Sequence, residues 1–253
     1  MFASRFLIGV RMTGLELLRS RYILALVFAM PLIFYLMIYV TSAERDMPML
    51  FGMVSDSREY LVNERDESLV FFGTGAIALV AAFIALKLTQ RHHESSRRLV
   101  LCGYSTTEVL LSRIGTLLLS LIPLGCYVLL LLLCFFTPGS ILPVTAGFVL
   151  AGFVYAALGA LIGVLFRNEI EGVLAVLLIA NIDAVWMQNP IYYTASEHRE
   201  IIRVLPAYFP TQASMLGAFT DESVLAAAGA SLLYGGILLL IALFIYWRRM
   251  RVV

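Results

Sequence analysis

Residues 88–113 read LTQRHHESSRRLVLCGYSTTEVLLSR and separate two long apolar segments by a charged connection. Four arginines against two glutamates place this connection in the cytoplasm by the positive-inside rule. A glutamate and an arginine four residues apart favour a helix that leaves the preceding segment, and Gly103 stands where a left-handed helix cap would fall. Ser105 and Glu108 have the capping-box spacing just before the next apolar run. The stretch therefore predicts a helix, a break and a second helix that enters the membrane.

Composition points to a membrane protein before any motif is considered. Hydrophobic residues make up 61% of the 253 residues and charged residues only 14%. A chain of this composition cannot bury its apolar surface in a water-soluble core. The three cysteines show neither a disulfide framework nor the spacing of metal ligands, and we expect no cleavable signal peptide because four arginines are scattered over the first 21 residues.

Span lengths and charge give the topology. An apolar helix of about 20 residues crosses the hydrocarbon core, and the uncharged run 114–166 is long enough for two such helices, split by Thr-Pro-Gly-Ser at 137–140. We expect an all-α protein with an interfacial helix at 1–21, spans at 22–40, 69–88, 114–136, 143–166, 170–187 and 224–247, a cytoplasmic region at 89–113 and a re-entrant outer segment at 188–223. This arrangement puts 13 of the 18 lysines and arginines inside, with both termini in the cytoplasm.

The N-terminal helix and the central spans have distinct patterns. Apolar residues recur every three or four positions from Phe2 to Ser20, which favours a helix lying along the inner leaflet over an unstructured leader. In the second span, Ala78 and Ala82 are small residues four apart, as are Gly159 and Gly163 in the fourth. Such pairs allow close packing of membrane helices.

The fifth span carries the polar residues Asn181 and Asp183. Two positions apart on a helix, they point to nearly opposite sides, so they cannot share one face. Beyond this span, the stretch 201–220 mixes apolar residues with Pro206 and Pro210, which is typical of short helices that dip into the outer leaflet and return.

Together these features resemble an ABC-2 type transporter permease. The resemblance rests on the amphipathic N-terminal helix, the six spans, the stretch ESSRRLVLCGYSTTEVLLSR between the second and third, and the Leu205-Pro206 segment before the last. In that family the cytoplasmic helix between the second and third spans is a coupling helix that contacts a separate ATP-binding subunit, and the N-terminal helix lies beside it. By position, the ATPase-coupling residues would be Glu94, Arg97, Arg98, Leu99 and Gly103, with Arg11 and Glu16 on the N-terminal helix.

The resemblance also implies the assembly. Such transporters combine two permeases with two ATPase subunits, so a second permease, identical or paralogous, is expected in the cell membrane. The chain has no GxxxxGK[ST] phosphate loop, so ATP hydrolysis belongs to the partner and no cofactor is expected on this chain. Lipid surrounds the spans, and no nucleic-acid partner is expected.

Family resemblance further assigns the polar residues of the fifth span. The second and fifth spans flank the cavity where two permeases meet, which makes Asn181 the candidate for the substrate path or the dimer interface. Asp183 is expected to pair with the outer segment, with Arg203 as its candidate partner, or to reach interfacial water. Asp183, Arg203 and Pro206 would then form an outer gate.

Three other functional classes compete with a permease. An intramembrane enzyme lacks a second carboxylate within the span of Asp183, and His92-His93-Glu94 is not a zinc-binding HExxH motif. A secondary, ion-coupled transporter would place ionisable groups near the bilayer midplane, whereas Asp183 lies nearer the outer surface. A membrane scaffold without a transport function is the third alternative, and the sequence does not exclude it. The few fixed charges of the spans favour export of an amphipathic or hydrophobic compound such as a drug, lipid or peptide.

Overall fold

A computed structural model of the protein describes residues 2–54, 59–90, 106–166 and 168–251. Within these ranges six helices are long and apolar enough to cross a membrane, and the chain is an all-α polytopic membrane protein. They are α2 (Arg21–Thr41), α3 (Glu64–Gln90), α5 (Thr106–Leu133), α6 (Ile141–Leu165), α7 (Glu169–Ala180) with its continuation η1 (Asn181–Met187), and α11 (Leu225–Arg251).

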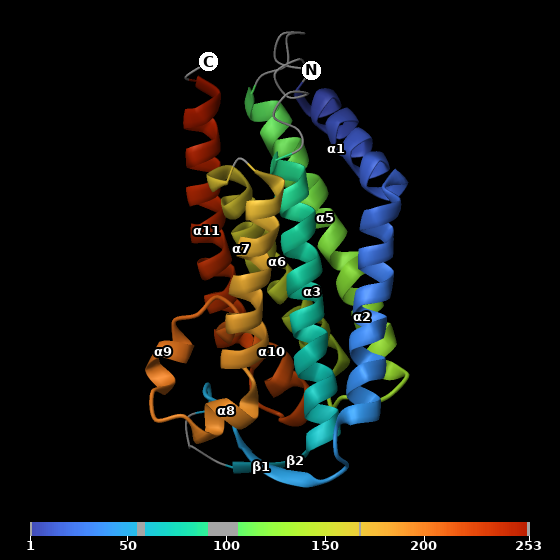
Figure 1. The fold of residues 1–253 in the computed structure, drawn as a ribbon, viewed down its shortest axis with the longest axis vertical. Coiled ribbons are helices and arrows are strands. Elements are labelled where there is room, and N and C mark those ends of the chain that lie inside the picture. The colour runs from blue at the N-terminus through green and yellow to red at the C-terminus, as the bar shows by residue number, and fades with distance from the viewer. Residues whose placement is uncertain (1, 55–58, 91–105, 167, 252–253) are drawn as a thin grey trace.

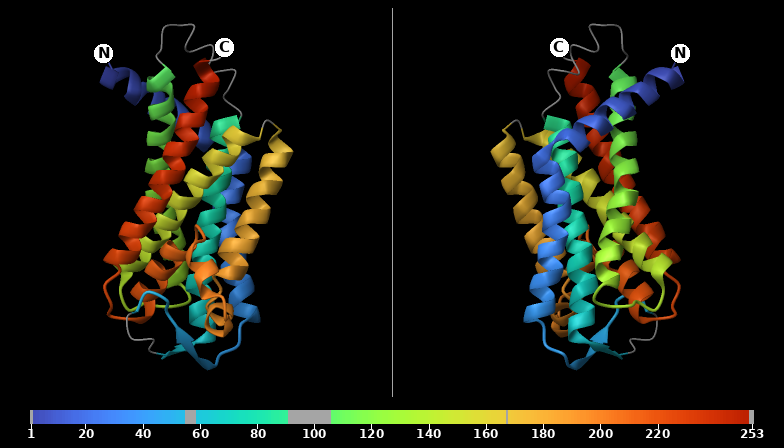
Figure 2. Two further views of the ribbon diagram at one scale, coloured as in Figure 1. Left: turned by 90° about the vertical axis from the view of Figure 1, so that its left-hand side faces the viewer. Right: turned by 90° about the vertical axis from the view of Figure 1, so that its right-hand side faces the viewer.

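The bundle has two different ends. Both termini and the ends of α3 and α5 that flank residues 91–105 lie at one end, which we call the terminal end (Figure 1). A small sheet and three short helices lie at the other, which we call the hairpin end. Helix α1 (Phe2–Arg19) is separated from α2 by Ser20 alone and slants away from the bundle axis at the terminal end (Figure 2).

Helices α3 and α6 form the centre of the bundle. In their most apolar stretches 89% and 72% of the residues are buried, compared with 17% for α2 and α11, which therefore present most of their surface outward. The two central helices approach closely at Gly159, where an added Cβ would lie 2.7 Å from the Cα of Ala82. Gly163 similarly has no room for a Cβ beside Thr89. The prediction that these small residues permit close helix packing is confirmed.

The hairpin end contains a small sheet in the stretch between the spans expected at 22–40 and 69–88. Strands β1 (Asp46–Leu50) and β2 (Glu59–Asn63) pair antiparallel, with Asp46 opposite Asn63. Helix α3 then starts at once, five residues before the span boundary expected at Leu69. Its first turn holds three acidic residues, which suit the positive end of the helix dipole.

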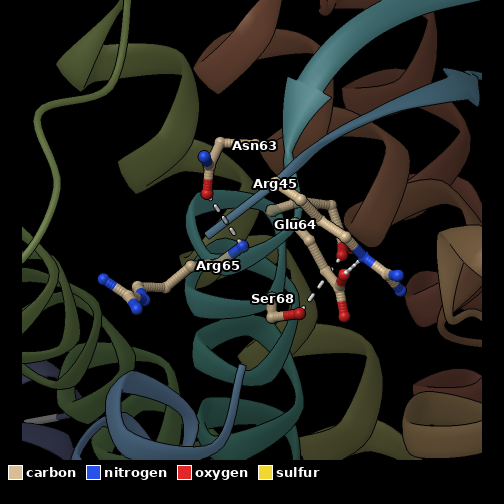
Figure 3. A network of polar contacts seen from close by, with 6 residues as sticks. Arg45, Asn63, Glu64, Arg65 and Ser68 are labelled. Carbon is tan, nitrogen blue, oxygen red and sulfur yellow. Dashed lines mark hydrogen bonds and ion pairs between the residues drawn. The ribbon is translucent and has the colours of Figure 1, made fainter. Parts of the chain in front are cut away.

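Side chains fix this early helix start. The Asn63 Oδ1 accepts the backbone N–H of Arg65 at 3.1 Å, as a helix cap does, and Arg45 forms an ion pair with Glu64 (Figure 3). The apolar periodicity of the sequence begins only after these polar residues. The periodicity therefore marks the membrane-embedded part of α3 and does not include the first turn of the helix.

The segment after η1 folds into α8 (Pro190–Ala195), α9 (Arg199–Arg203) and α10 (Tyr208–Phe219). Helix α10 packs against α6, α11 and α3, and residues 208–218 are buried apart from Phe209. A Cβ added at Gly147 of α6 would lie 2.5 Å from the backbone nitrogen of Ser214, so α6 and α10 touch through their backbones. Helix α10 is therefore part of the bundle and not a surface loop.

Candidate functional site

The stretch expected to bind an ATPase falls largely on residues that the structure does not describe. Glu94, Arg97, Arg98, Leu99 and Gly103 all lie within 91–105, outside the described residues. The structure describes the two helix ends that flank this stretch, Gln90 of α3 and Thr106 of α5. What these ends contact determines which helices would move with the connection.

Helix α1 lies along the first turns of α5. A Cβ added at Gly9 would lie 2.8 Å from the Ser112 side chain, so the two helices meet closely there. The Thr116 hydroxyl lies 3.3 Å from the carbonyl oxygen of Val10, to which it can donate. Among the predicted coupling residues of α1, Arg11 and Glu16 are both exposed. Helix α1 and the start of α5 therefore form one packed unit.

Arg113 connects this unit to the last helix. Its Nη1 donates to the Tyr246 hydroxyl at 3.3 Å, and its guanidinium interacts electrostatically with Glu16. One side chain on α5 thus joins α1 to α11. Arg249 of α11 in turn donates to the carbonyl oxygen of Val164, at the end of α6.

Gln90, the last residue of α3, makes a similar connection on the other side. Its Nε2 donates to the carbonyl oxygens of Phe166 at 3.1 Å and Asn168 at 3.3 Å, between α6 and α7. The Asn168 side chain caps α7 by accepting the N–H of Ile170. The helices that flank residues 91–105 are consequently tied to α1, α6, α7 and α11.

At the hairpin end, Asp183 is the centre of a buried hydrogen-bond cluster. Only 2% of this residue is exposed. Its Oδ2 accepts the Tyr155 hydroxyl at 2.6 Å and the backbone N–H of Ala207 at 2.9 Å, and its Oδ1 accepts Gln188 Nε2 at 3.2 Å. Three donors from three segments satisfy a carboxylate that would be costly to bury without partners.

These contacts agree with the expected pairing of Asp183 with the outer segment but correct its candidate partner, Arg203. Its contact with the outer segment is the backbone of Ala207, immediately after Pro206, whereas Arg203 donates from Nε to the Tyr193 hydroxyl at 3.2 Å. Arg203 is exposed, so its charge can remain hydrated. A buried carboxylate is served well by short-range N–H and O–H donors, which bring no second charge to desolvate.

Backbone geometry contributes to this cluster. Residues 181–187 form a π-helix, a wider turn that occurs mostly as short segments and often at functional positions. Asp183 points into the protein there, whereas Asn181 is exposed and its Nδ2 donates to the carbonyl oxygen of Leu177 at 2.8 Å. The two polar residues thus face different surroundings.

A second layer lies outside the Asp183 cluster. Tyr193 and Tyr208 are buried side by side, with ring centroids 6.0 Å apart. Burial raises the pKa of Tyr208 above its usual value, and its hydrogen bond with Tyr193 adds to this shift. The hydroxyl of Tyr193, in turn, raises the pKa of Arg203. Tyr208 therefore stays protonated at neutral pH and serves as a hydrogen-bonding group.

Several candidate site residues were not predicted from the sequence. Tyr155 and Gln188 complete the Asp183 cluster, but no spacing links them to it. Glu67 lies between the spans expected at 22–40 and 69–88, yet only 1% of it is exposed and its Oε1 is buried without a hydrogen-bond partner among the described residues. Charge counts record how many acids a loop contains and give no indication of which one turns inward.

Comparison with known families identifies this architecture. The family model described as ABC-2 family transporter protein matches residues 62–246, from β2 into α11. The chain belongs to the ABC-2 transporter family. Its members are transport components, generally not catalytic themselves, that associate with an ATP-binding subunit. This ABC-2 protein is therefore a multi-pass membrane permease, and no curated protein matches its sequence.

Proposed function

We propose that this ABC-2 permease is the membrane-spanning subunit of an exporter driven by a separate ATPase that docks on residues 88–113. The observation that carries this proposal is the set of contacts around that stretch. Helix α5 starts at its end and is bonded through Arg113 to α11 and through Thr116 to α1. Helix α3 ends at its beginning and is bonded through Gln90 to the turn before α7. A push on the connection would reach four other helices of the bundle, α1, α6, α7 and α11.

Orientation follows from charge. We place the terminal end in the cytoplasm of a cell-membrane protein because the arginine-rich stretches of the sequence adjoin helix ends that lie there. Arg11 and Glu16 are both exposed at this end, where a docked ATPase subunit could contact them. The β1–β2 hairpin and α8–α10 would then face outward.

The chemical character of the bundle supports a hydrophobic or amphipathic cargo. Between Leu69 and Leu86 helix α3 has no charged residue. Fixed charges that would hold a small ion are therefore missing from this stretch of the helix. We accordingly assign export of a drug, lipid or hydrophobic peptide, and leave the compound itself to experiment.

A second permease, identical or paralogous, would complete the path, with two ATPase subunits beneath. We place it on the outward face of α7 and η1, where large apolar side chains recur every four residues: Ile170, Leu174, Leu178, Ile182 and Trp186. Asn181 is exposed beside Ile182. On this face it would line the substrate path or contact the second permease, while Asp183, Arg203 and Pro206 would belong to the outer gate.

Copurification tests the proposal. The permease is expressed with the ATPase encoded nearest to its gene, and the complex is isolated through the permease. We expect a bound subunit that hydrolyses ATP. Replacing Arg97 and Arg98 together with glutamate should abolish this association, because an attractive contact becomes repulsive, while the permease still inserts. The matched control reverses Arg248, an exposed residue on α11.

The outcomes separate the competing functions. Retained ATPase binding and transport in the charge-reversed variant would refute the docking assignment. Loss of correct insertion would mean that the two arginines serve only the positive-inside rule. A secondary transporter or a scaffold would bring down no ATPase at all.

A further inference from the structure

Helices α2 and α7 flank a cavity on the face of α3 at the terminal end. Both helices pack on α3 without an extensive contact with each other in the described part of the chain, and α3 stands between them (Figure 1). The cavity has a volume of about 250 Å³. It is lined by Tyr22, Ile23 and Leu26 of α2, by Phe83, Ile84, Leu86, Lys87 and Gln90 of α3, and by Glu169 and Val173 of α7.

Polarity changes with depth in this cavity. Lys87, Gln90 and Glu169 lie within the first or last turn of their helices, at the terminal end. Leu26 lies four residues beyond Tyr22, and Val173 lies four residues beyond Glu169. At 1.5 Å per residue, both lie about 6 Å deeper than the rim. A charged rim above an apolar interior is the polarity profile of a membrane lipid, with its headgroup at the surface and its chain below.

The rim carries charges of both signs. Lys87 is the only lysine of the chain, and its ammonium lies 5.9 Å from the centre of the Tyr22 ring, a cation–π arrangement that orients it. Glu169 is the first residue of α7, where the helix dipole stabilises its carboxylate. The hydrogen bonds of Gln90 to the turn before α7 hold the two helix ends together. The spacing of the two charges is therefore built into the fold.

We propose that this cavity binds a phospholipid with a phosphoethanolamine headgroup. Its phosphate would accept from Lys87, its primary ammonium would donate to Glu169, and the upper part of one acyl chain would lie against Leu26, Phe83 and Val173. An anionic headgroup without an ammonium would leave Glu169 repelled, and a quaternary headgroup could not donate a hydrogen bond to it. This binding is separate from the proposed export function and needs no ATPase.

Lipid retention in defined bilayers tests the site. The protein is reconstituted in nanodiscs containing phosphatidylethanolamine, phosphatidylcholine and phosphatidylglycerol in equal amounts, then released into detergent, and the retained lipids are identified by native mass spectrometry. We expect phosphatidylethanolamine to be enriched about tenfold, the effect of one good charge-assisted contact. Glu169→Gln should remove the preference over phosphatidylglycerol, and Lys87→Gln should remove retention of both.

Glu171→Gln is the matched control, because Glu171 is an exposed acid in the same helix turn that does not line the cavity. A second measurement uses the single lysine. Acylation of Lys87 by an amine-reactive reagent, followed by peptide mapping, should be about tenfold slower in phosphatidylethanolamine than in phosphatidylcholine.

Three results would overturn the proposal. The first is equal retention of the three lipids by the unmodified protein. The second is an equal effect of Glu169→Gln and Glu171→Gln. The third is protection of Lys87 that depends on protein concentration and not on the lipid, which would assign the cavity to an interface with a second copy of this chain.

Discussion

The Asp183 carboxylate accepts the Tyr155 hydroxyl at 2.6 Å, which joins the π-helical end of the fifth span to the middle of α6. The same oxygen accepts the Ala207 N–H directly before α10. Three segments of the hairpin end therefore share one buried carboxylate. If this cluster holds an outer gate closed, weakening it should affect stability and gating together.

Asp183→Asn should lower the stability of the protein. The carboxylate receives three donors, but an amide has only one oxygen and brings an N–H₂ that faces a donor, so at least one hydrogen bond is lost at a cost of about 1–3 kcal/mol. We expect a lower thermal midpoint in detergent or a higher basal ATPase rate of the complex. Asn181→Leu is the control: it lies two residues away on the exposed side, and should alter substrate range or affinity with folding intact.

A different outcome would change the class of transporter. If Asp183→Asn left stability and ATPase rate unchanged, but made export insensitive to a proton gradient on which the unmodified protein depends, the ion-coupled interpretation would replace the ABC one. Export by proteoliposomes, measured with and without an imposed gradient, decides between them.

Arg113→Gln should uncouple ATP hydrolysis from transport. The substitution removes the charged donor that bonds α5 to Tyr246 and interacts with Glu16, while the predicted docking stretch stays intact. We expect unchanged copurification with the ATPase but several-fold less substrate exported per ATP hydrolysed. Arg248→Gln is the comparison, because Arg248 is exposed and its guanidinium lies over Phe244 of its own helix. Equal loss in both variants would contradict the role of Arg113.

Gly159→Val should prevent α3 and α6 from packing. Even a Cβ would lie 2.7 Å from the Ala82 Cα, and the atoms that it would meet belong to the backbone of α3, which cannot shift locally. Overpacking of this kind costs about 1–3 kcal/mol or more, so we expect poor yield and a lowered midpoint of thermal unfolding. Gly236→Ala in α11 meets nothing within 4 Å and should be neutral or stabilising by up to about 1 kcal/mol. Comparable midpoints for the two variants would argue against close backbone contact.

Gly103→Val combined with Ser105→Ala addresses the break predicted within the connection. A side chain is poorly tolerated in a left-handed position, and a lost helix cap costs about 1 kcal/mol. Transport should fall more than surface expression does, because the membrane core is untouched. Parallel loss of both would mean that the break serves folding alone. These residues lie outside those the structure describes, so the expectation rests on sequence.

The sequence predicted the spans well because lipid imposes a simple rule on them. About 20 apolar residues are needed to cross, and arginines collect on one side, so hydropathy and charge locate the six helices. Small residues at helical spacing likewise predicted that another helix could pack closely at Ala82 and at Gly159, although they did not predict that these two residues meet. Both signals are local in sequence.

The candidate site was less accessible, because its contacts join distant residues. Tyr155 and Asp183 are 28 positions apart, and Gly52 donates its N–H to Gln212 over 160 positions. Charge suggested Arg203 as the partner of Asp183, whereas the structure uses a backbone N–H that every residue except proline possesses. No recognised sequence composition predicts the π-helix at 181–187.

Helix α6 is held at three heights by different partners. Its end at Val164 accepts a hydrogen bond from Arg249, Tyr155 bonds Asp183, and Gly147 touches Ser214. Because α6 is a rigid helix attached at these points, a small displacement of it can break one of its hydrogen bonds. A movement of about 1.5 Å along the Tyr155–Asp183 bond, equal to the rise of one helical residue, would lengthen it to about 4 Å and break it. If the proposed ATPase opens the outer gate by breaking this bond, the movement that it must cause is shorter than one helical turn.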